Sequence, residues 1–152
     1  MHRLKGEYKQ ASELIEKAVV ICQEHLPARW DVYYSSGLAA LEAGDCVLAA
    51  RRFKELVQHA QKSDNKSGLG MYLDGLAAVA ADTHRPELAA KLHGAALTIL
   101  EVSEDNYFSA DARMLERHIH TARGHLGEAN FIATVNEGRK LTLEQAIQLA
   151  LG

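Results

Sequence analysis

The feature that most constrains this chain is a short turn that recurs between segments of helical pattern. In "AGDCVLAARRF", the pair Gly44-Asp45 interrupts two such segments for only two residues. Glycine adopts the left-handed backbone that ends a helix, and an aspartate carboxylate accepts hydrogen bonds from the free N–H groups of the next one. The pair therefore predicts a helix end followed at once by a helix start.

The same arrangement is found three times along the chain. Each turn, at Gly6, Gly44 or His84-Arg85, is followed five residues later by an alanine and nine residues later by a bulky side chain. The alanines are Ala11, Ala49 and Ala89, and the bulky residues are Ile15, Phe53 and His93. The alanines lie 38 and then 40 residues apart. A helical period near 40 predicts an all-α solenoid of antiparallel hairpins, each burying its apolar face on its neighbours.

The expected organisation is one helical-repeat domain over 1–152. Repeats are expected at about 4–25, 28–63 and 67–102, and C-terminal capping helices at 107–151. Within this last region, apolar spacing predicts a helix from about 108 to 126, followed by a shorter helix that Gly138 ends. Thr142 to Gln145 fits a capping box that starts a final apolar turn. We expect about seven or eight helices in all.

Composition limits the kinds of partner and the cellular compartment that we expect for this protein. The 152 residues are 47% apolar and carry a formal net charge of −3, so no overall positive field favours nucleic acid or an anionic membrane as a partner. No apolar run approaches the roughly 18–20 residues that span a bilayer. The two cysteines, Cys22 and Cys46, do not make a disulfide framework. We expect a cytoplasmic protein without a cofactor.

The repeated segments resemble the tetratricopeptide repeat. Its turn is matched at Gly44-Asp45, and its small first-helix residues are matched by Gly37 with Ala40 and by Ala77 with Ala80. The chain departs from the pattern at Ser36, at His93 and in its longer period. The resemblance implies a right-handed superhelix whose first-type helices line a concave surface. Because the chain starts on a second-type helix, it looks like a piece of a longer array.

Two C-terminal motifs resemble a helical region of large bacterial regulators. These motifs are "AKLHGAA", residues 90–96, and "GRKLTLEQAIQLA", residues 138–150. They are similar to sequence segments in signal-transduction ATPases of the maltose-activator type and in their LuxR-type relatives. The resemblance implies a non-catalytic interaction or sensor scaffold, or alternatively a fragment of a LuxR-type transcription regulator whose DNA-binding part lies outside this chain. No G-x-x-x-x-G-K-(S/T) phosphate loop is present in the sequence.

The resemblance places a partner-binding groove on the first-type helices. Its acidic margin and apolar centre suit a protein or peptide with apolar anchors and Lys or Arg flanks. An equally acceptable interpretation is that Leu38 and Leu41 simply pack within the stack. The expected lining is Asp31, Tyr34, Leu38, Leu41, Glu42, Met71, Asp74, Ala78, Ala81 and Asp82.

The N-terminal helix carries apolar residues on more than one face and has no preceding partner helix. Repeat arrays normally need a polar cap at such an end, so we expect this helix to associate with a second copy of the chain. The residues expected to form the contact are Leu14, Ile15, Ala18, Val19 and Ile21.

Other chemistry has weaker support. His118 and His120 fall on different faces of a helix, so a metal site is not expected. His93 is expected to be a core histidine bonded to a backbone carbonyl.

Cys46, at a helix start, is either a reactive thiol or a small apolar residue. A small all-α enzyme remains a distant alternative, because the carboxylates at 101–105 lie in a polar loop that does not raise a pKa. The basic residues Arg113, Arg117, Arg123, Arg139 and Lys140 lack interleaved aromatics and suit a solvated face.

Overall fold

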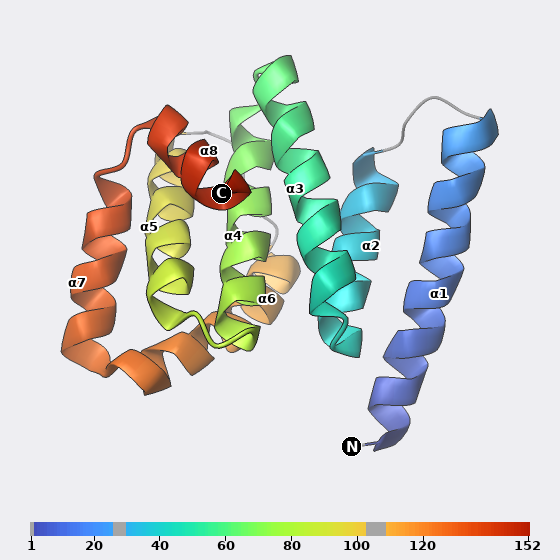
Figure 1. Cartoon of the computed structure of the whole chain (residues 1–152), viewed down its shortest axis with the longest axis horizontal. Helices are drawn as coiled ribbons and strands as arrows, with labels where there is room; N and C mark the ends of the chain where they lie inside the picture. The colour runs from blue at the N-terminus through green and yellow to red at the C-terminus, as the bar shows by residue number, and fades with distance from the viewer. Residues whose placement is uncertain (1, 26–29, 103–108) are drawn as a thin grey trace.

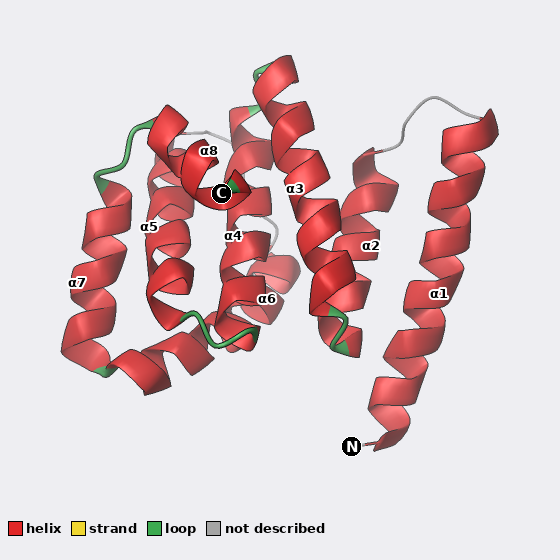
Figure 2. Cartoon of the chain, viewed as in Figure 1, coloured by secondary structure: helices red, strands yellow, loops and turns green. Residues whose placement is uncertain are grey.

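The computed structural model describes residues 2–25, 30–102 and 109–152, and within these ranges every regular element is an α-helix (Figure 2). The prediction of an all-α chain with seven or eight helices is therefore confirmed for the described residues. The eight helices are α1 (His2–His25), α2 (Trp30–Ala43), α3 (Cys46–Ser63), α4 (Lys66–Asp82), α5 (Pro86–Val102), α6 (Ser109–Leu126), α7 (Glu128–Arg139) and α8 (Leu143–Leu151).

The helices pack mostly on their neighbours in sequence, in antiparallel fashion. Helices α1 to α5 follow one another across the molecule, and α7 continues the row beyond α5 (Figure 1). Helix α6 leaves the row and packs against α4 and α5 on one side, while α8 contacts α3 and α5 on the other. Because α6 crosses the row, the C-terminal part of the chain returns to the middle of the row and packs on α4 and α5.

The turns at Gly44, Asp64 and His84 have the same backbone geometry, with φ of 55° at Asp64 and a hydrogen bond from the Asn65 N–H to the Ala60 carbonyl over 3.1 Å. Gly44 and His84 both adopt the left-handed conformation, with φ of 84° and 62°. In each turn the next N–H donates to the carbonyl five residues earlier: Asp45 to Ala40 over 2.8 Å, and Arg85 to Ala80 over 2.9 Å. Two of the three predicted turns are therefore confirmed, and the second of these is made without glycine. The prediction of a turn at Gly6 is wrong, because Gly6 lies inside helix α1.

Side-chain caps start the helices where the sequence predicts them. The Asp45 carboxylate accepts a hydrogen bond from the Leu48 N–H over 3.1 Å at the start of α3. Thr142 and Gln145 form the expected capping box of α8, with both reciprocal hydrogen bonds present. These bonds satisfy N–H groups that have no partner inside the helix.

Phe53 occupies the centre of the row. Its side chain is fully buried, and its ring lies so close to α2 and α4 that a Cβ at Gly37 or Gly75 would fall 2.9 Å or 2.6 Å from it. Tyr34 meets the same ring edge-on, with the centroids 6.1 Å apart. The small residues on either side therefore make room for one large aromatic side chain.

A buried arginine joins the first three helices. Arg52, on α3, is only 4% exposed, and its Nε donates to Ser36 Oγ on α2 over 3.2 Å. Its Nη2 contacts Glu16 on α1, and its Nη1 donates to Glu55 over 3.1 Å. This network explains why Ser36 stands where the repeat pattern has an apolar residue: a hydroxyl satisfies the buried guanidinium.

Helices α5 and α7 approach each other at backbone contact. A Cβ at Gly94 would lie 2.0 Å from the Val135 carbonyl oxygen, and a Cβ at Gly138 would lie 2.1 Å from the Lys91 carbonyl oxygen. The expectation that Gly138 ends its helix is wrong, since α7 continues to Arg139. The glycine is needed because no side chain fits between the two helices.

Overpacking at the repeat alanine gives a first test of the register. Ala49 is fully buried, so replacing it with leucine is expected to destabilise the fold by about 1–3 kcal/mol in urea denaturation followed by circular dichroism. Val47, two residues earlier on α3, is 83% exposed, and Val47→Leu is the matched control with an effect near zero. Equal stability of the two variants would show that Ala49 does not face the neighbouring helix.

Candidate partner-binding surface

Ten residues of α2 and α4 are expected to line a groove, and the structure divides them into two groups. Helix α6 packs on α4, and its Leu115, Ile119 and Ala122 are buried. It reaches the C-terminal end of α2 through the side chains of Arg117 and His118, which contact Glu42. The N-terminal ends keep partly exposed side chains. Leu41, Asp74, Ala78 and Ala81 are at most 4% exposed and so do not line an open surface in this structure.

A histidine of α6 joins this helix to the C-terminal ends of α2 and α4. His118 Nδ1 lies 2.7 Å from Asp82 Oδ2 at the end of α4, and its Nε2 lies 2.9 Å from Glu42 Oε1 at the end of α2. A carboxylate only accepts hydrogen bonds, so an imidazole that donates to two carboxylates must carry a proton on both nitrogens. Glu42 and Asp82, predicted to steer a basic partner, are therefore paired within the chain by a cation.

The surroundings of His118 act on its pKa in opposite directions. Burial lowers the pKa, whereas the hydrogen bonds and charges of Asp82 and Glu42 raise it, and the balance is a pKa above the ordinary 6.5. Arg117, on the same helix, lies 3.9 Å from Glu42 and is a second cation at this carboxylate. Cys46 is a further titratable group near Asp82, and burial, followed by the charge of Asp82, raises the pKa of its thiol.

The raised pKa of His118 predicts how stability depends on pH. The stabilisation is complete below the unfolded-state value of 6.5 and is lost as the pH rises through the higher folded-state pKa. As the pH rises above 6.5 we expect the unfolding free energy to fall by about 1.5–3 kcal/mol, the contribution of one hydrogen bond to a charged group. Urea denaturation at a series of pH values measures this dependence.

His120 supplies the control for this measurement, because it is exposed on the same helix. His118→Gln should remove most of the pH dependence in that range, and His120→Gln should leave it unchanged. A pH profile that is the same for both variants would contradict a charged bridge at His118.

A second histidine pairs with a buried carboxylate. His93 Nδ1 lies 2.7 Å from Asp74 Oδ1, and Asp74 is 3% exposed. The expectation that His93 bonds to a backbone carbonyl is therefore wrong. Burial raises the pKa of Asp74, although the hydrogen bond and the charge of His93 act to lower it. This pair joins α4 to α5. Because both side chains are largely shielded from solvent, the pair contributes to the contact between the two helices.

The open end of the α2–α4 face keeps four of the expected lining residues. Asp31 is exposed, and Tyr34, Leu38 and Met71 are half-buried. The Tyr34 ring packs against Tyr72 of α4, with the centroids 5.7 Å apart, so α2 and α4 meet directly here. This end combines apolar side chains with an acidic one, and its role in partner binding stays a prediction. We call Asp31, Tyr34, Leu38 and Met71 the open face.

The residues expected to mediate self-association do not share one environment. Val19 is fully buried against the rest of the chain, and Ile15 and Ala18 are half-buried. Leu14 is 65% exposed and Ile21 is 53% exposed, so these two face solvent on the outer side of α1.

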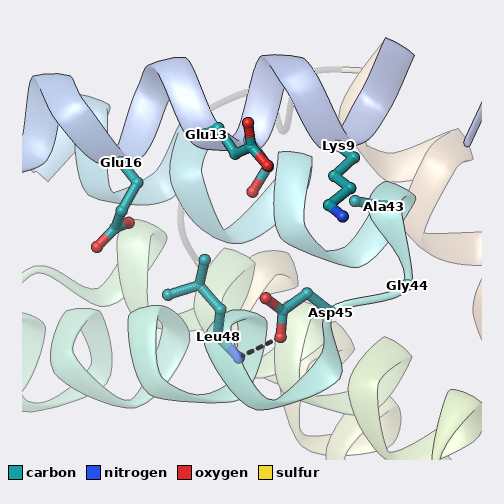
Figure 3. Close-up of a pocket in the computed structure, with 8 residues that line it drawn as sticks. Lys9, Glu13, Glu16, Ala43, Gly44, Asp45 and Leu48 are labelled. Carbon is teal, nitrogen blue, oxygen red and sulfur yellow. Dashed lines mark hydrogen bonds between the residues drawn. The ribbon is translucent and has the colours of Figure 1, made fainter. Parts of the chain in front are cut away.

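A cleft opens between α1 and the turn that joins α2 to α3, with a volume of about 540 Å³. Figure 3 shows Lys9 of α1 beside Ala43 at this turn, with Glu13 and then Glu16 further along α1, away from the turn. The Asp45 carboxylate is already used as the cap of α3. Glu16 belongs to the arginine network, so two of the three carboxylates here hold the fold together.

The remaining chemical candidates give no reactive centre in the described residues. Burial, followed by the charges of Asp82 and Asp45, raises the pKa of the Cys46 thiol, which disfavours the reactive thiolate. Within the described ranges no three His, Cys, Asp or Glu side chains are placed to hold a metal ion. Glu101 is paired with Arg139 over 2.9 Å, and residues 104 and 105 lie outside the described residues.

Two polar contacts between helices were not predicted from the sequence: the His118 bridge and the Arg52 network. His118 lies 76 residues from Glu42 along the chain, and Arg52 lies 36 residues from Glu16. No local pattern connects residues so far apart. The one available signal was Ser36, a polar residue in an apolar position.

No family model matches this sequence. Searches of curated proteins and of solved structures likewise give no match. In the part of the chain that the structure describes, none of the helices combines the length and apolarity needed to cross a bilayer.

Proposed function

We propose that this chain is a non-catalytic, tetratricopeptide-like scaffold that binds a protein or peptide partner within a cytoplasmic bacterial signalling or transcription-regulatory protein. The observation that carries the proposal is the repeated turn. Gly44 and His84 share a left-handed backbone with the intervening turn at Asp64. A fully buried alanine follows five residues after Gly44 and His84, whereas Leu69 stands at that place after Asp64. Repetition of one hairpin unit at an interval of forty residues is typical of arrays that present an extended surface to a partner.

The link to bacterial regulators is supported by the packing of the two C-terminal motifs. Gly94 belongs to the first motif and Gly138 opens the second, and these glycines meet where α5 and α7 touch. Thr98, just beyond the first motif, also donates to the Arg139 carbonyl over 3.1 Å. The two motifs therefore form one structural unit. This unit also favours the second candidate, a fragment of a LuxR-type regulator whose DNA-binding part lies outside this chain.

The partner is proposed to bind the open face. Helix α6 covers the other end of α2 and α4, where His118 already occupies the carboxylates of Glu42 and Asp82. At the open face, Leu38 and Met71 offer apolar contact, and the formal net charge of −3 on the chain favours a bound segment with basic flanks. A peptide with Leu or Phe anchors between Lys or Arg residues has the complementary chemistry.

Fluorescence anisotropy with designed peptides tests this proposal. The probes share Leu and Phe anchors and differ only in Lys or Glu flanks. We expect the Lys-flanked peptide to bind more tightly, and its affinity to fall several-fold between about 50 mM and 500 mM salt because exposed charges are screened. Leu38→Ser should weaken binding by about tenfold, which corresponds to roughly 1.4 kcal/mol.

Val47→Ser is the control, because Val47 is an exposed apolar residue on α3, away from the open face. Preferential binding of the Glu-flanked peptide or of duplex DNA, or equal effects of the two serine variants, would contradict the proposal.

A further inference from the structure

The outer side of α1 is an apolar surface without a neighbour among the described helices. Helix α1 packs mainly on α2, using a face that includes the fully buried Val19. On its opposite side Leu14 and Ile21 are 65% and 53% exposed. Figure 1 shows α1 at the edge of the row, so this side faces away from the molecule.

Small and large residues follow a regular pattern on this side, where Leu14 and Ile21 are exposed and Ala11 and Ala18 beside them are half-buried. Ala11, Leu14, Ala18 and Ile21 follow at spacings of three, four and three residues, which places them in one stripe along the helix. Small and large side chains alternate along it. We call these four residues the outer stripe.

We propose that the outer stripe pairs with the same stripe of a second copy of this chain, in an antiparallel two-fold arrangement. In the register that sets Leu14 opposite Ala18 of the second copy, Ile21 lies opposite Ala11, and symmetry repeats both pairs. Each large side chain then meets a small one, which lets the two helices approach closely. The pattern is complementary to itself only when one helix is reversed.

Charges beside the stripe agree with this register. Glu13 and Lys17 are exposed on one flank of the outer stripe. In an antiparallel pair related by a two-fold axis, the same flanks of both helices meet. Lys17 of one copy then lies within about 3 Å, measured along the helix axis, of Glu13 of the other copy. The two Lys17 side chains come near the axis, and each has a glutamate of the opposite copy beside it.

The pairing is independent of partner binding, because the outer stripe lies on α1 and the open face lies on α2 and α4. One pair of helices buries less surface than a standard interface of about 1,200–2,000 Å². The dimer should therefore be weak, with a dissociation constant on the order of 10–100 μM.

Sedimentation equilibrium over about 5–500 μM protein, a range that brackets such a constant, is the first test. Wild-type chain should convert from monomer to dimer across this range. The double variant Leu14→Lys, Ile21→Lys should stay monomeric while keeping its helical circular dichroism, because both side chains are already largely exposed. Val47→Lys, at an exposed position on α3, should dimerise like the wild type. A monomeric wild-type chain, or a dimer insensitive to the double variant, would overturn the proposal.

Cross-linking tests the register. In a chain whose two native cysteines are replaced by serine, Lys17→Cys should be joined into a dimer by a short bismaleimide, because position 17 lies close to the two-fold axis. Gln10→Cys is the matched control, since the two copies of position 10 would be about 18 Å apart along the helix axis. Cross-linking at position 10, or equal yields at both positions, would overturn the proposed pairing.

Discussion

Replacing Phe53 with alanine is expected to destabilise the fold by about 3–5 kcal/mol. Phe53 is fully buried, and its ring fills the space that Gly37 on α2 and Gly75 on α4 leave open. Removing it leaves a cavity that two helices without side chains at the contact cannot fill. Since small domains are stable by about 5–15 kcal/mol, this is a large share of the total.

Urea denaturation followed by circular dichroism measures this loss, and Phe53→Leu separates the cavity from the loss of the aromatic ring. Leucine refills much of the volume, so its cost should be clearly smaller than that of alanine. Ile132→Ala is the control for truncation of an apolar side chain, because Ile132 is 47% exposed on α7. A loss below about 1 kcal/mol for Phe53→Ala would show that Phe53 does not form the centre of the packing.

Replacing Gly138 with alanine is expected to cost at least about 3 kcal/mol, the upper end of the usual range for overpacking. The new Cβ would lie 2.1 Å from the Lys91 carbonyl oxygen, and a backbone atom cannot turn aside as a side chain can. Helix α7 must therefore move away from α5. Gly94→Ala should act in the same way, because its Cβ would meet the Val135 carbonyl oxygen at 2.0 Å.

Gly124 is the matched control for these two variants. It lies within α6, and no atom lies within 4 Å of a Cβ placed there. Gly124→Ala should stabilise the fold by up to about 1 kcal/mol, because alanine favours the helix more than glycine does. In urea denaturation the free energy of unfolding should therefore fall for Gly138→Ala and rise for Gly124→Ala. A neutral Gly138→Ala variant would mean that α5 and α7 do not touch.

The hairpins could be predicted from the sequence because their signals are local. A left-handed residue, a capping side chain and an alanine five residues later lie within ten residues of one another. Gly44, Asp45 and Ala49 illustrate this, and the structure confirms their backbone roles. The capping box at Thr142 was predictable for the same reason.

Contacts between distant helices could not be predicted in this way. Gly138 was interpreted as a helix end because glycine serves that purpose in a local pattern, yet its role comes from α5, more than forty residues earlier. The return of α6 over α4 was also missed. It brings His118 to carboxylates from two other helices, and a lone histidine on a helix gives no sign of such partners. The groove was therefore predicted at full length although one end is covered.

The most direct test of the proposed binding function is a titration of the isotopically labelled chain with the Lys-flanked peptide, followed by backbone amide shifts in two-dimensional NMR spectra. We predict that the changes concentrate at Asp31, Leu38 and Met71 and fit one dissociation constant. The resonances of Asp82 and His118 should remain in place, because α6 keeps that end covered. Shifts confined to residues outside the open face, or an unchanged spectrum at saturating peptide, would contradict a partner-binding surface on α2 and α4.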